Sequence, residues 1–166
     1  MKISYSADLY VLLTIDGLYI FIPQSQIESV EIIADTHITS TTTGAVGWFS
    51  QGHGGGRDVP VFCLSKNLTL QQDIPQSREY FVLLKSKDEQ APVGITCDEV
   101  ENLNIKHEEL FFQELPAVMK NQGFFESPIE QFLIYNEKVA CVCTGEKLTD
   151  YIHTQSQHYI EKRTDY

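Results

Sequence analysis

The sequence predicts a mainly β fold, and three observations lead to this prediction. Short runs rich in β-branched and aromatic residues recur along most of the chain. Turn residues such as Asp16-Gly17 join consecutive runs closely enough for local hairpins. Only residues 115–122 and the segment after Thr144 have the apolar spacing of helices. Many short strands joined by hairpins are typical of small closed barrels.

Length and composition limit the range of functions. The 166 residues suffice for one domain, and the 42% apolar content can fill a core without metals or disulfides. The formal charge of -11 repels a phosphate backbone, so we expect no nucleic-acid partner. No apolar run approaches the roughly 18 residues of a membrane span, and residues 1–8 lack a signal-peptide core. We therefore expect a soluble, cytoplasmic protein without direct membrane insertion.

The first third of the chain begins with a hairpin. Residues 9–15 and 18–22 are its strands, and Asp16-Gly17 is its two-residue turn. Residues 25–28 (SQIE) fit a capping box, which predicts a short helical turn after Pro23. The apolar pattern resumes over residues 27–34, where we expect a third strand.

A polar loop and a glycine-rich loop follow. Residues 36–43 are rich in Ser and Thr and are expected to form a loop before the apolar residues 46–49. Residues 51–57 (QGHGGGR) could suggest a phosphate cradle. The strand-like residues 58–64 follow them, however, with no helix start and no Lys-Ser/Thr, so a hairpin tip is the better interpretation.

The second half repeats the hairpin pattern. A strand over residues 79–85 and its return over 92–97 flank a charged turn, and a further hairpin over 130–143 surrounds Asn136-Glu137. The helix after Thr144 should present one apolar face, formed by Leu148, Tyr151, Ile152, Gln155 and Tyr159.

The four cysteines lack the spacing of a metal site. Cys141 and Cys143 are two apart in a strand-like run, so both should point to one face as small core residues. No CxxC pair and no nucleophile motif occurs, so we expect no metal, no cofactor and no disulfide. A small thiol enzyme that uses Cys63 or Cys97 beside a histidine remains an alternative, because sequence does not show which side chains meet.

The order of the segments resembles CheW-like domains, the scaffold proteins that couple receptors to CheA-type histidine kinases. The resemblance covers roughly residues 7–152, and its most specific part is Val93-Gly94-Ile95-Thr96-Cys97-Asp98-Glu99-Val100, close to the family's Gly-Ile-x-Val-Asp-x-Val. All five matching places occur in the family's order: residues 10–23, 27–30, 59–64, 93–100 and 132–152.

The resemblance implies a CheW-like fold of two packed SH3-like five-stranded β-barrels with a few short helices. The two lobes would cover roughly residues 7–70 and 78–152, with the last strand or helix able to cross back. Residues 153–166 would form a helical extension or a flexible tail.

The chain departs from the family's pattern at an ion pair. Aligned through Pro60, the position of the family's arginine is Gly55 and that of its glutamate is Ser29, so both partners are missing together. Joint loss is physically sensible, because one partly buried charge without the other is costly. Arg57 and Glu31, each two residues away, could restore a displaced pair.

A further departure points to a subgroup. Gly47-Trp48-Phe49, ahead of the glycine-rich loop, is more similar to the CheW-like adaptors of chemosensory pili systems, which control twitching motility. The aspartate of the family's Val-Pro-Val-x-Asp-Leu strand is replaced by Cys63.

The resemblance implies a non-enzymatic adaptor in chemotaxis signal transduction. Its partners would be the regulatory domain of a CheA-type histidine kinase and the cytoplasmic tip of a methyl-accepting receptor. The alternatives are a free-standing β-barrel interaction module outside such signalling, and the thiol enzyme above. Ile27, Val30 and Trp48 could equally be core residues, and Asp98 a turn cap. The candidate protein-binding residues are Ile27, Ser29, Val30, Trp48, Gly55, Arg57 and Asp98.

Overall fold

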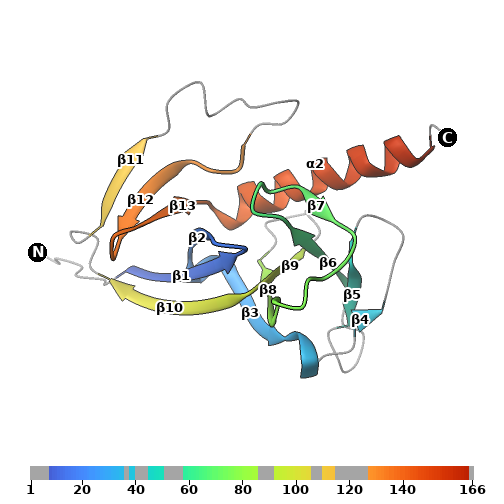
Figure 1. Ribbon diagram of the computed structural model, residues 1–166, viewed down its shortest axis with the longest axis horizontal. Coiled ribbons are helices and arrows are strands. Elements are labelled where there is room, and N and C mark those ends of the chain that lie inside the picture. Colours follow the sequence, from blue (N-terminus) through green and yellow to red (C-terminus); the bar gives the residue numbers. More distant parts are fainter. Residues whose placement is uncertain are drawn as a thin grey trace, which may run out of the picture.

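The computed structural model describes residues 8–35, 38–39, 45–50, 58–85, 92–105, 110–114 and 127–164. The fold is mainly β, as predicted, with a long helix at the C-terminal end (Figure 1). The elements are β1 (Asp8–Ile15), β2 (Leu18–Pro23), η1 (Gln24–Gln26), β3 (Ile27–Ile32), η2 (Ile33–Asp35), β4 (Ile38–Thr39), β5 (Gly47–Ser50), β6 (Asp58–Leu64), β7 (Leu70–Gln71), β8 (Tyr80–Leu84), β9 (Gly94–Cys97), β10 (Glu99–Ile105), β11 (Phe111–Glu114), β12 (Gln131–Tyr135), β13 (Lys138–Val142) and α2 (Gly145–Thr164).

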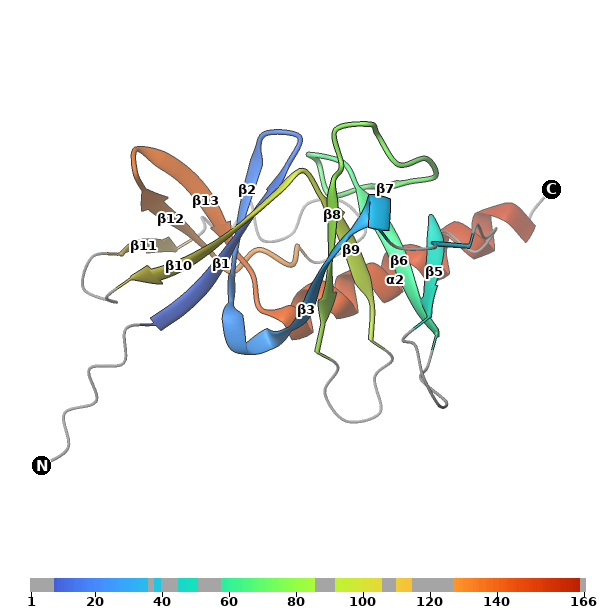
Figure 2. The same ribbon diagram turned by 90° about the horizontal axis from the view of Figure 1, so that it is seen from below.

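The strands form two sheets that lie side by side (Figure 2). Sheet A has six strands in the order β10-β1-β2-β13-β12-β11. Sheet B has seven strands, in the order β3-β8-β9-β6-β5-β4 with β7 added on β6. Both sheets are mostly antiparallel, but β13 on β2 and β6 on β9 are parallel pairs. The sheets therefore contain more strands than the five expected for each barrel.

The two sheets do not correspond to the two predicted lobes, which were residues 7–70 and 78–152. Sheet A takes β1 and β2 from the start of the chain and β10 to β13 from its end, whereas β3 to β9 form sheet B. The chain leaves sheet A at η1 and returns to it at Asp98, between β9 and β10. A hairpin repeat in the sequence could not reveal this exchange, because it records local pairing and not the partner of each hairpin.

Three apolar clusters fill the molecule. The inter-sheet core contains residues of β1 and β2 together with residues of β6, β8, β9 and α2. A second cluster lies within sheet A around Phe21 and Leu133, and a third within sheet B around Val61 and Phe81. Strand β1 serves two of them, since Leu13 joins the inter-sheet core and its neighbour Leu12 joins the sheet A cluster. Burial on both faces explains its nearly continuous apolar sequence.

Helix α2 packs on the inter-sheet core through Leu148 and Ile152, both fully buried. The Tyr151 hydroxyl donates a hydrogen bond to the Leu68 carbonyl at 2.7 Å, which ties the helix to sheet B. The predicted helical face is confirmed for these residues. The expected extension or tail after residue 152 continues α2 as far as Thr164.

The hairpin turns are where the sequence places them. Asp16 and Gly17 have φ of 49° and 88°, and Asn136 and Glu137 have φ of 48° and 64°. Both central residues of a type I′ turn need positive φ, which Asp, Asn and Gly adopt most easily.

The capping-box prediction is wrong in its mechanism. A short 3-10 turn does follow Pro23, but Ser25 lies inside it and the turn has no side-chain cap. Gln26 caps a different element, because its Oε1 accepts a hydrogen bond from the Gly145 N–H at the start of α2. The helix start is also capped by Thr144, whose Oγ1 accepts from the Lys147 N–H at 3.1 Å.

Some elements were missed. Strand β10 alternates apolar and polar residues, and its buried Leu103 and Ile105 lie between exposed Glu and Asn side chains. The sequence analysis did not predict this strand, because most of its residues are polar. The two-residue strand β4 lies inside the expected loop 36–43, and the short strands β7 and β11 carry little signal. The glycine-rich loop 51–57, the turn 86–91 and the expected helix 115–122 lie outside the described residues.

Candidate protein-binding surfaces

Strand β3 stands at one end of sheet B, where it pairs with β8. The register shifts between Ile27 and Ser29, which marks a β-bulge. Ile27 precedes the bulge and is buried in the inter-sheet core. The structure therefore places Ile27 with the core residues.

Val30 and Ile32 follow the bulge and form an exposed apolar pair, named here the β3 pair. Their exposed fractions are 41% and 46%, and they share one face because they are two apart in a strand. Val30 lies opposite Val82, which belongs to the inter-sheet core. The β3 pair is therefore a solvent-exposed extension of the apolar surface of that core. Val30 is thus not a core residue, and Ile32, which the sequence analysis did not single out, joins it.

Ser29 and Glu31 project from the opposite face of β3. They lie across from Leu83 and Phe81, and both are partly buried. Gly55 and Arg57, the positions expected to carry or replace the family's arginine, lie outside the described residues.

Trp48 lies on β5 at the far side of sheet B from β3. It is partly buried and lies opposite Pro60 of β6 and Thr39 of β4. Trp48 and the β3 pair thus belong to strands that are not neighbours in the order of sheet B.

A second exposed apolar pair lies on sheet A. Ile134 of β12 and Val139 of β13 are directly opposite each other, with exposed fractions of 40% and 59%. They face away from the sheet A cluster, which contains their neighbours Leu133 and Ala140. Strand alternation around Asn136-Glu137 indicates that these two side chains share a face, but it does not indicate that this face is exposed. Among the described residues, each sheet thus has one exposed apolar pair, and sheet A also exposes the single residue Leu9 of β1.

Arg78, which the sequence analysis missed, lies in a buried polar cluster between the sheets. Its side chain is fully buried, and its Nη2 lies 2.7 Å from the Leu64 carbonyl and 2.9 Å from Asp16 Oδ2. Its Nη1 donates to the Thr96 carbonyl at 3.2 Å and contacts Thr96 Oγ1 at 3.1 Å. Leu64 and Thr96 belong to sheet B, whereas Asp16 is in the β1–β2 turn of sheet A, so Arg78 joins the two sheets.

Asp98 completes this cluster. Its Oδ2 accepts a hydrogen bond from the Asp16 N–H at 2.7 Å, and its own N–H donates to the Thr14 carbonyl at 2.7 Å. Asp98 Oδ1 lies 3.1 Å from Arg78 Nε as an ion pair, without the alignment of a hydrogen bond. The structure gives Asp98 a capping role, although it caps the β1–β2 turn of sheet A and not the turn between β9 and β10 in which it lies.

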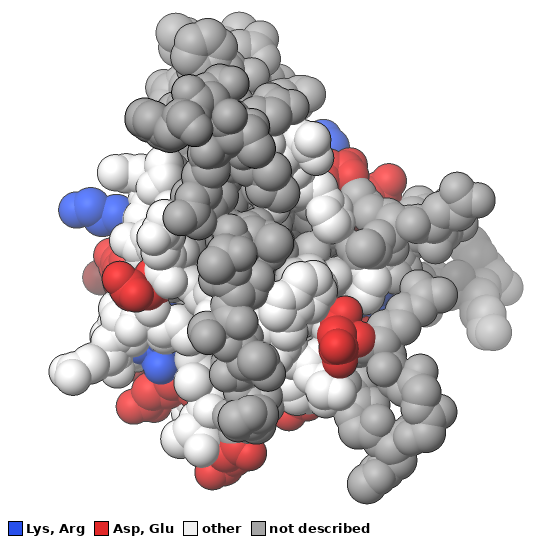
Figure 3. Space-filling model, turned by 90° about the vertical axis from the view of Figure 1, so that its right-hand side faces the viewer, with Lys and Arg blue, Asp and Glu red and all other residues white. Residues whose placement is uncertain are grey.

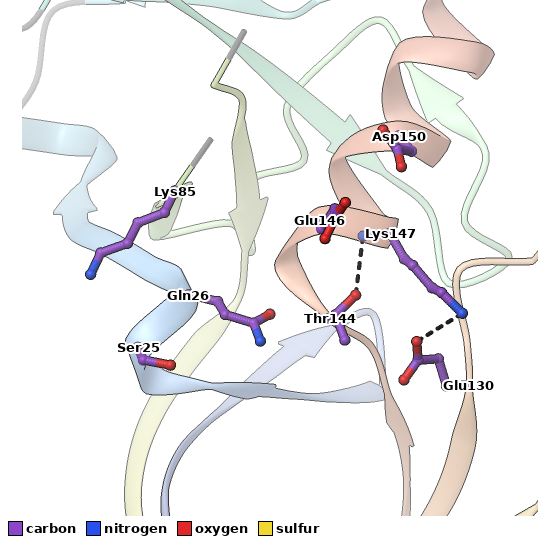
Figure 4. A pocket seen from close by; sticks show the side chains of 8 residues that line it. All are labelled: Ser25, Gln26, Lys85, Glu130, Thr144, Glu146, Lys147 and Asp150. Carbon is purple, nitrogen blue, oxygen red and sulfur yellow. Dashed lines mark hydrogen bonds and ion pairs between the residues drawn. The ribbon is translucent and has the colours of Figure 1, made fainter. Parts of the chain in front are cut away.

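An open pocket of about 510 Å³ lies beside the start of α2 (Figure 4). Its walls come from η1, the end of β8, the segment before β12 and the first turns of α2. Lys147 Nζ lies 2.8 Å from Glu130 Oε1 at its rim. The lining holds charges of both signs and includes neither Cys nor His, so it offers no thiol–imidazole pair.

All four cysteines are buried free thiols. Burial raises the pKa of the Cys63 thiol, and it raises that of Cys97 to about 12. A catalytic thiol needs a lowered pKa, because the thiolate is the nucleophile. Among the described residues, no group of three or more His, Cys, Asp or Glu side chains could hold a metal ion. These environments favour inert core thiols.

Acidic side chains are spread over the face shown in Figure 3 and are not gathered into one cluster. They agree with the formal charge of -11, which repels a phosphate backbone. Within the described part of the chain, no helix has the length and apolar character needed to cross a membrane.

No protein-family model and no curated protein sequence matches this chain. Among solved structures, the fold is similar to the crystal structure of the scaffolding protein TtCheW from Thermoanaerobacter tengcongensis, with a TM-score of 0.62 and 14% sequence identity. The similarity covers 86% of this chain and 92% of that chain. The expectation of a CheW-like fold is thereby confirmed.

Proposed function

We propose that the protein is a non-enzymatic adaptor in chemotaxis-type signal transduction. It would couple methyl-accepting receptors to the regulatory domain of a CheA-type histidine kinase, in the cytoplasm and at receptor arrays of the inner membrane. It would act in a pilus system that controls twitching motility, and the similarity of Gly47-Trp48-Phe49 to that subgroup supports this part of the proposal.

The presence of one exposed apolar pair on each sheet carries this proposal. An adaptor needs two surfaces that are occupied at the same time. Val30 with Ile32 and Ile134 with Val139 lie on different sheets, and exposed apolar side chains are the usual anchors of protein interfaces. The CheW-like fold supports the same conclusion, because the similar solved structure is that of a scaffolding protein.

The thiol-enzyme alternative has no such support. Cys97 is fully buried, and its raised pKa keeps it protonated near neutral pH. Cys63 is also buried, and its Sγ lies 3.5 Å from the amide oxygen of Gln71, with no described histidine as its partner.

The test is a binding experiment with purified components from the source organism. The labelled adaptor is titrated with the kinase regulatory domain, with a receptor signalling tip, and with both together. We expect each to bind alone and all three to form one complex in gel filtration. Val30→Asp and Val139→Asp should each weaken a different partner, and each serves as the control for the other.

Two outcomes would contradict the proposal. If neither protein binds at micromolar concentration, the fold serves as an interaction module outside chemosensory signalling. If both compete for one surface, the protein is not an adaptor that bridges them. In cells, a fluorescent fusion should form foci that disappear when the receptors are deleted, and loss of the gene should impair twitching but not swimming.

A further inference from the structure

The buried polar cluster around Arg78 lies where segments of both sheets meet. This group, named here the Arg78 cluster, is formed by the side chains of Arg78, Asp16, Thr96 and Asp98. Arg78 lies two residues before β8, Asp16 is in the β1–β2 turn, and Asp98 stands where the chain passes from β9 to β10. A change in how these side chains meet therefore acts on segments of both sheets at once.

One route runs from Arg78 to the β3 pair. Tyr80 lies opposite Ile32 in the β3–β8 ladder. The Glu79 carbonyl accepts a hydrogen bond from the Ile33 N–H at 2.9 Å. Only Glu79 separates Arg78 from Tyr80 in the chain, and Ile32 is a member of the β3 pair. The end of β3 is therefore held by the two residues that follow Arg78.

A second route runs from Asp98 to the exposed apolar pair of sheet A, which contains Val139. The Asp98 N–H donates to the Thr14 carbonyl at 2.7 Å, and Thr14 lies opposite Tyr19 in the β1–β2 hairpin. The Lys138 ammonium lies 4.9 Å from the centre of the Tyr19 ring, and Lys138 precedes Val139 in β13. A short series of contacts thus connects each exposed pair to the Arg78 cluster.

One contact within the cluster is incomplete. Arg78 Nε and Asp98 Oδ1 lie 3.1 Å apart, and both atoms are buried. They are not aligned as a hydrogen bond, and neither atom has another hydrogen-bond partner among the described residues. Buried polar atoms without a hydrogen bond are rare and costly. A small movement of Asp98 that completes this bond would carry the β1–β2 turn with it, because the Asp16 N–H donates to Asp98 Oδ2.

We propose that the Arg78 cluster has two arrangements and through them couples the two exposed apolar pairs. In one arrangement the Arg78 Nε–H is unaligned with Asp98, and in the other it donates to Asp98 Oδ1. The completed bond fixes sheet A against sheet B, so a partner that selects this arrangement on one sheet also orders the surface on the other. Each partner then raises the affinity of the other by the same factor. This inference rests on the proposed function only for the identity of the two partners.

The first test needs no partner, so it can fail while the proposed function stands. Amide NMR spectra of the isotope-labelled wild type are compared with those of Asp16→Asn, Asp98→Asn and Thr96→Val, which each change one group of the cluster. Asn tolerates the positive φ of 49° at position 16. We expect the signals of residues 30–32 and of residues 138–139 to move in proportion across the series, because one two-state equilibrium shifts both surfaces.

Lys147→Met is the matched control for this series, since the ion pair of Lys147 with Glu130 lies outside the Arg78 cluster. It should leave the signals of residues 30–32 in place. Shifts confined to the neighbours of each substituted residue would overturn the proposal, and so would independent shifts on the two sheets. Three conservative variants keep the series informative if one of them does not fold.

The second test measures the coupling itself. The Kd of the kinase regulatory domain is measured with and without a saturating receptor tip, and then with the two partners exchanged. We expect each partner to strengthen the binding of the other by the same factor, about fivefold or more. Asp16→Asn and Asp98→Asn should bring this factor close to one, whereas Lys147→Met should keep it.

Two results of this titration would overturn the proposal. A factor of one in the wild type would show that the two surfaces are independent. A factor that survives both Asp16→Asn and Asp98→Asn would show that direct contact between the partners carries the coupling. If neither partner binds, the proposed function fails, and the partner-free spectra still decide whether the cluster has two arrangements.

Discussion

The guanidinium of Arg78 lies 2.9 Å from the carboxylate of Asp16, and this contact joins sheet B to sheet A at the turn between β1 and β2. The Arg78 side chain is fully buried, so its charge depends entirely on partners in the protein. Asp16 and Asp98 supply two carboxylates, and the Leu64 and Thr96 carbonyls accept hydrogen bonds from its Nη2 and Nη1. Arg78 is therefore the residue whose loss should most directly uncouple the two sheets.

We expect Arg78→Met to lower the free energy of unfolding by about 3–5 kcal/mol, because breaking a buried ion pair leaves its partners without compensation. Urea denaturation measures this change. Lys147→Met is the matched control, since its pair with Glu130 is largely exposed and should contribute at most about 1 kcal/mol. Equal effects of the two variants would show that the Arg78 cluster does not stabilise the fold.

We expect Val30→Asp to fold normally and Ile27→Asp to unfold the domain. Val30 is exposed, so a charge there stays hydrated and should change stability by no more than about 0.5 kcal/mol. Ile27 is buried, and an unpaired charge in the core costs several kcal/mol. Circular dichroism and thermal melting distinguish the two variants. A folded Val30→Asp that binds the kinase regulatory domain as tightly as wild type would remove Val30 from the interface.

Gly94→Ala and Gly17→Ala should both destabilise the protein, for different reasons. An added Cβ at Gly94 would lie 3.1 Å from Leu83 Cδ2 and 3.2 Å from Val61 Cγ2, so overpacking should cost about 1–3 kcal/mol. Gly17 has open space but a φ of +88°, which strains any other residue by about 1–2 kcal/mol. A double-mutant cycle with Leu83→Ala separates the two causes. It should show favourable coupling with Gly94→Ala and none with Gly17→Ala.

The buried Cys97 should make stability fall at alkaline pH. Its pKa is raised from an ordinary value of 9.0 to about 12, so between these values the unfolded chain loses the proton that the folded chain keeps. Stability from this group is fully present below pH 9 and decreases as pH rises toward about 12. Denaturation midpoints of wild type and Cys97→Ala across this range measure the effect. We expect a shallower decline in the variant, and identical slopes would contradict the burial of an ionisable thiol.

Local features were predictable because they depend on neighbouring residues. Asp16-Gly17 and Asn136-Glu137 indicated two hairpins, since few residues tolerate the positive φ of a type I′ turn. Strand β3 was predicted from its apolar pattern, and Val30 was among the candidate binding residues, whose contact with a partner stays a prediction. Ile32 and the pair of Ile134 and Val139 were missed, because an apolar residue in a strand looks the same whether its face is covered or exposed.

The sequence by itself determined the β class, most hairpins and the apolar face of α2, because these follow from residue periodicity and turn chemistry over short distances. Only the tertiary structure decided that β1 pairs with β10 and β2 with β13, and that neither pairs with the strands that follow β2 in the chain. It also decided that Arg78 contacts Asp16, which lies 62 positions earlier. Both outcomes depend on which apolar surfaces find each other after the hairpins form. The packing of the two sheets also buries Ile27 and leaves Val30 exposed to solvent. It thereby decides which apolar residues are accessible to a partner protein.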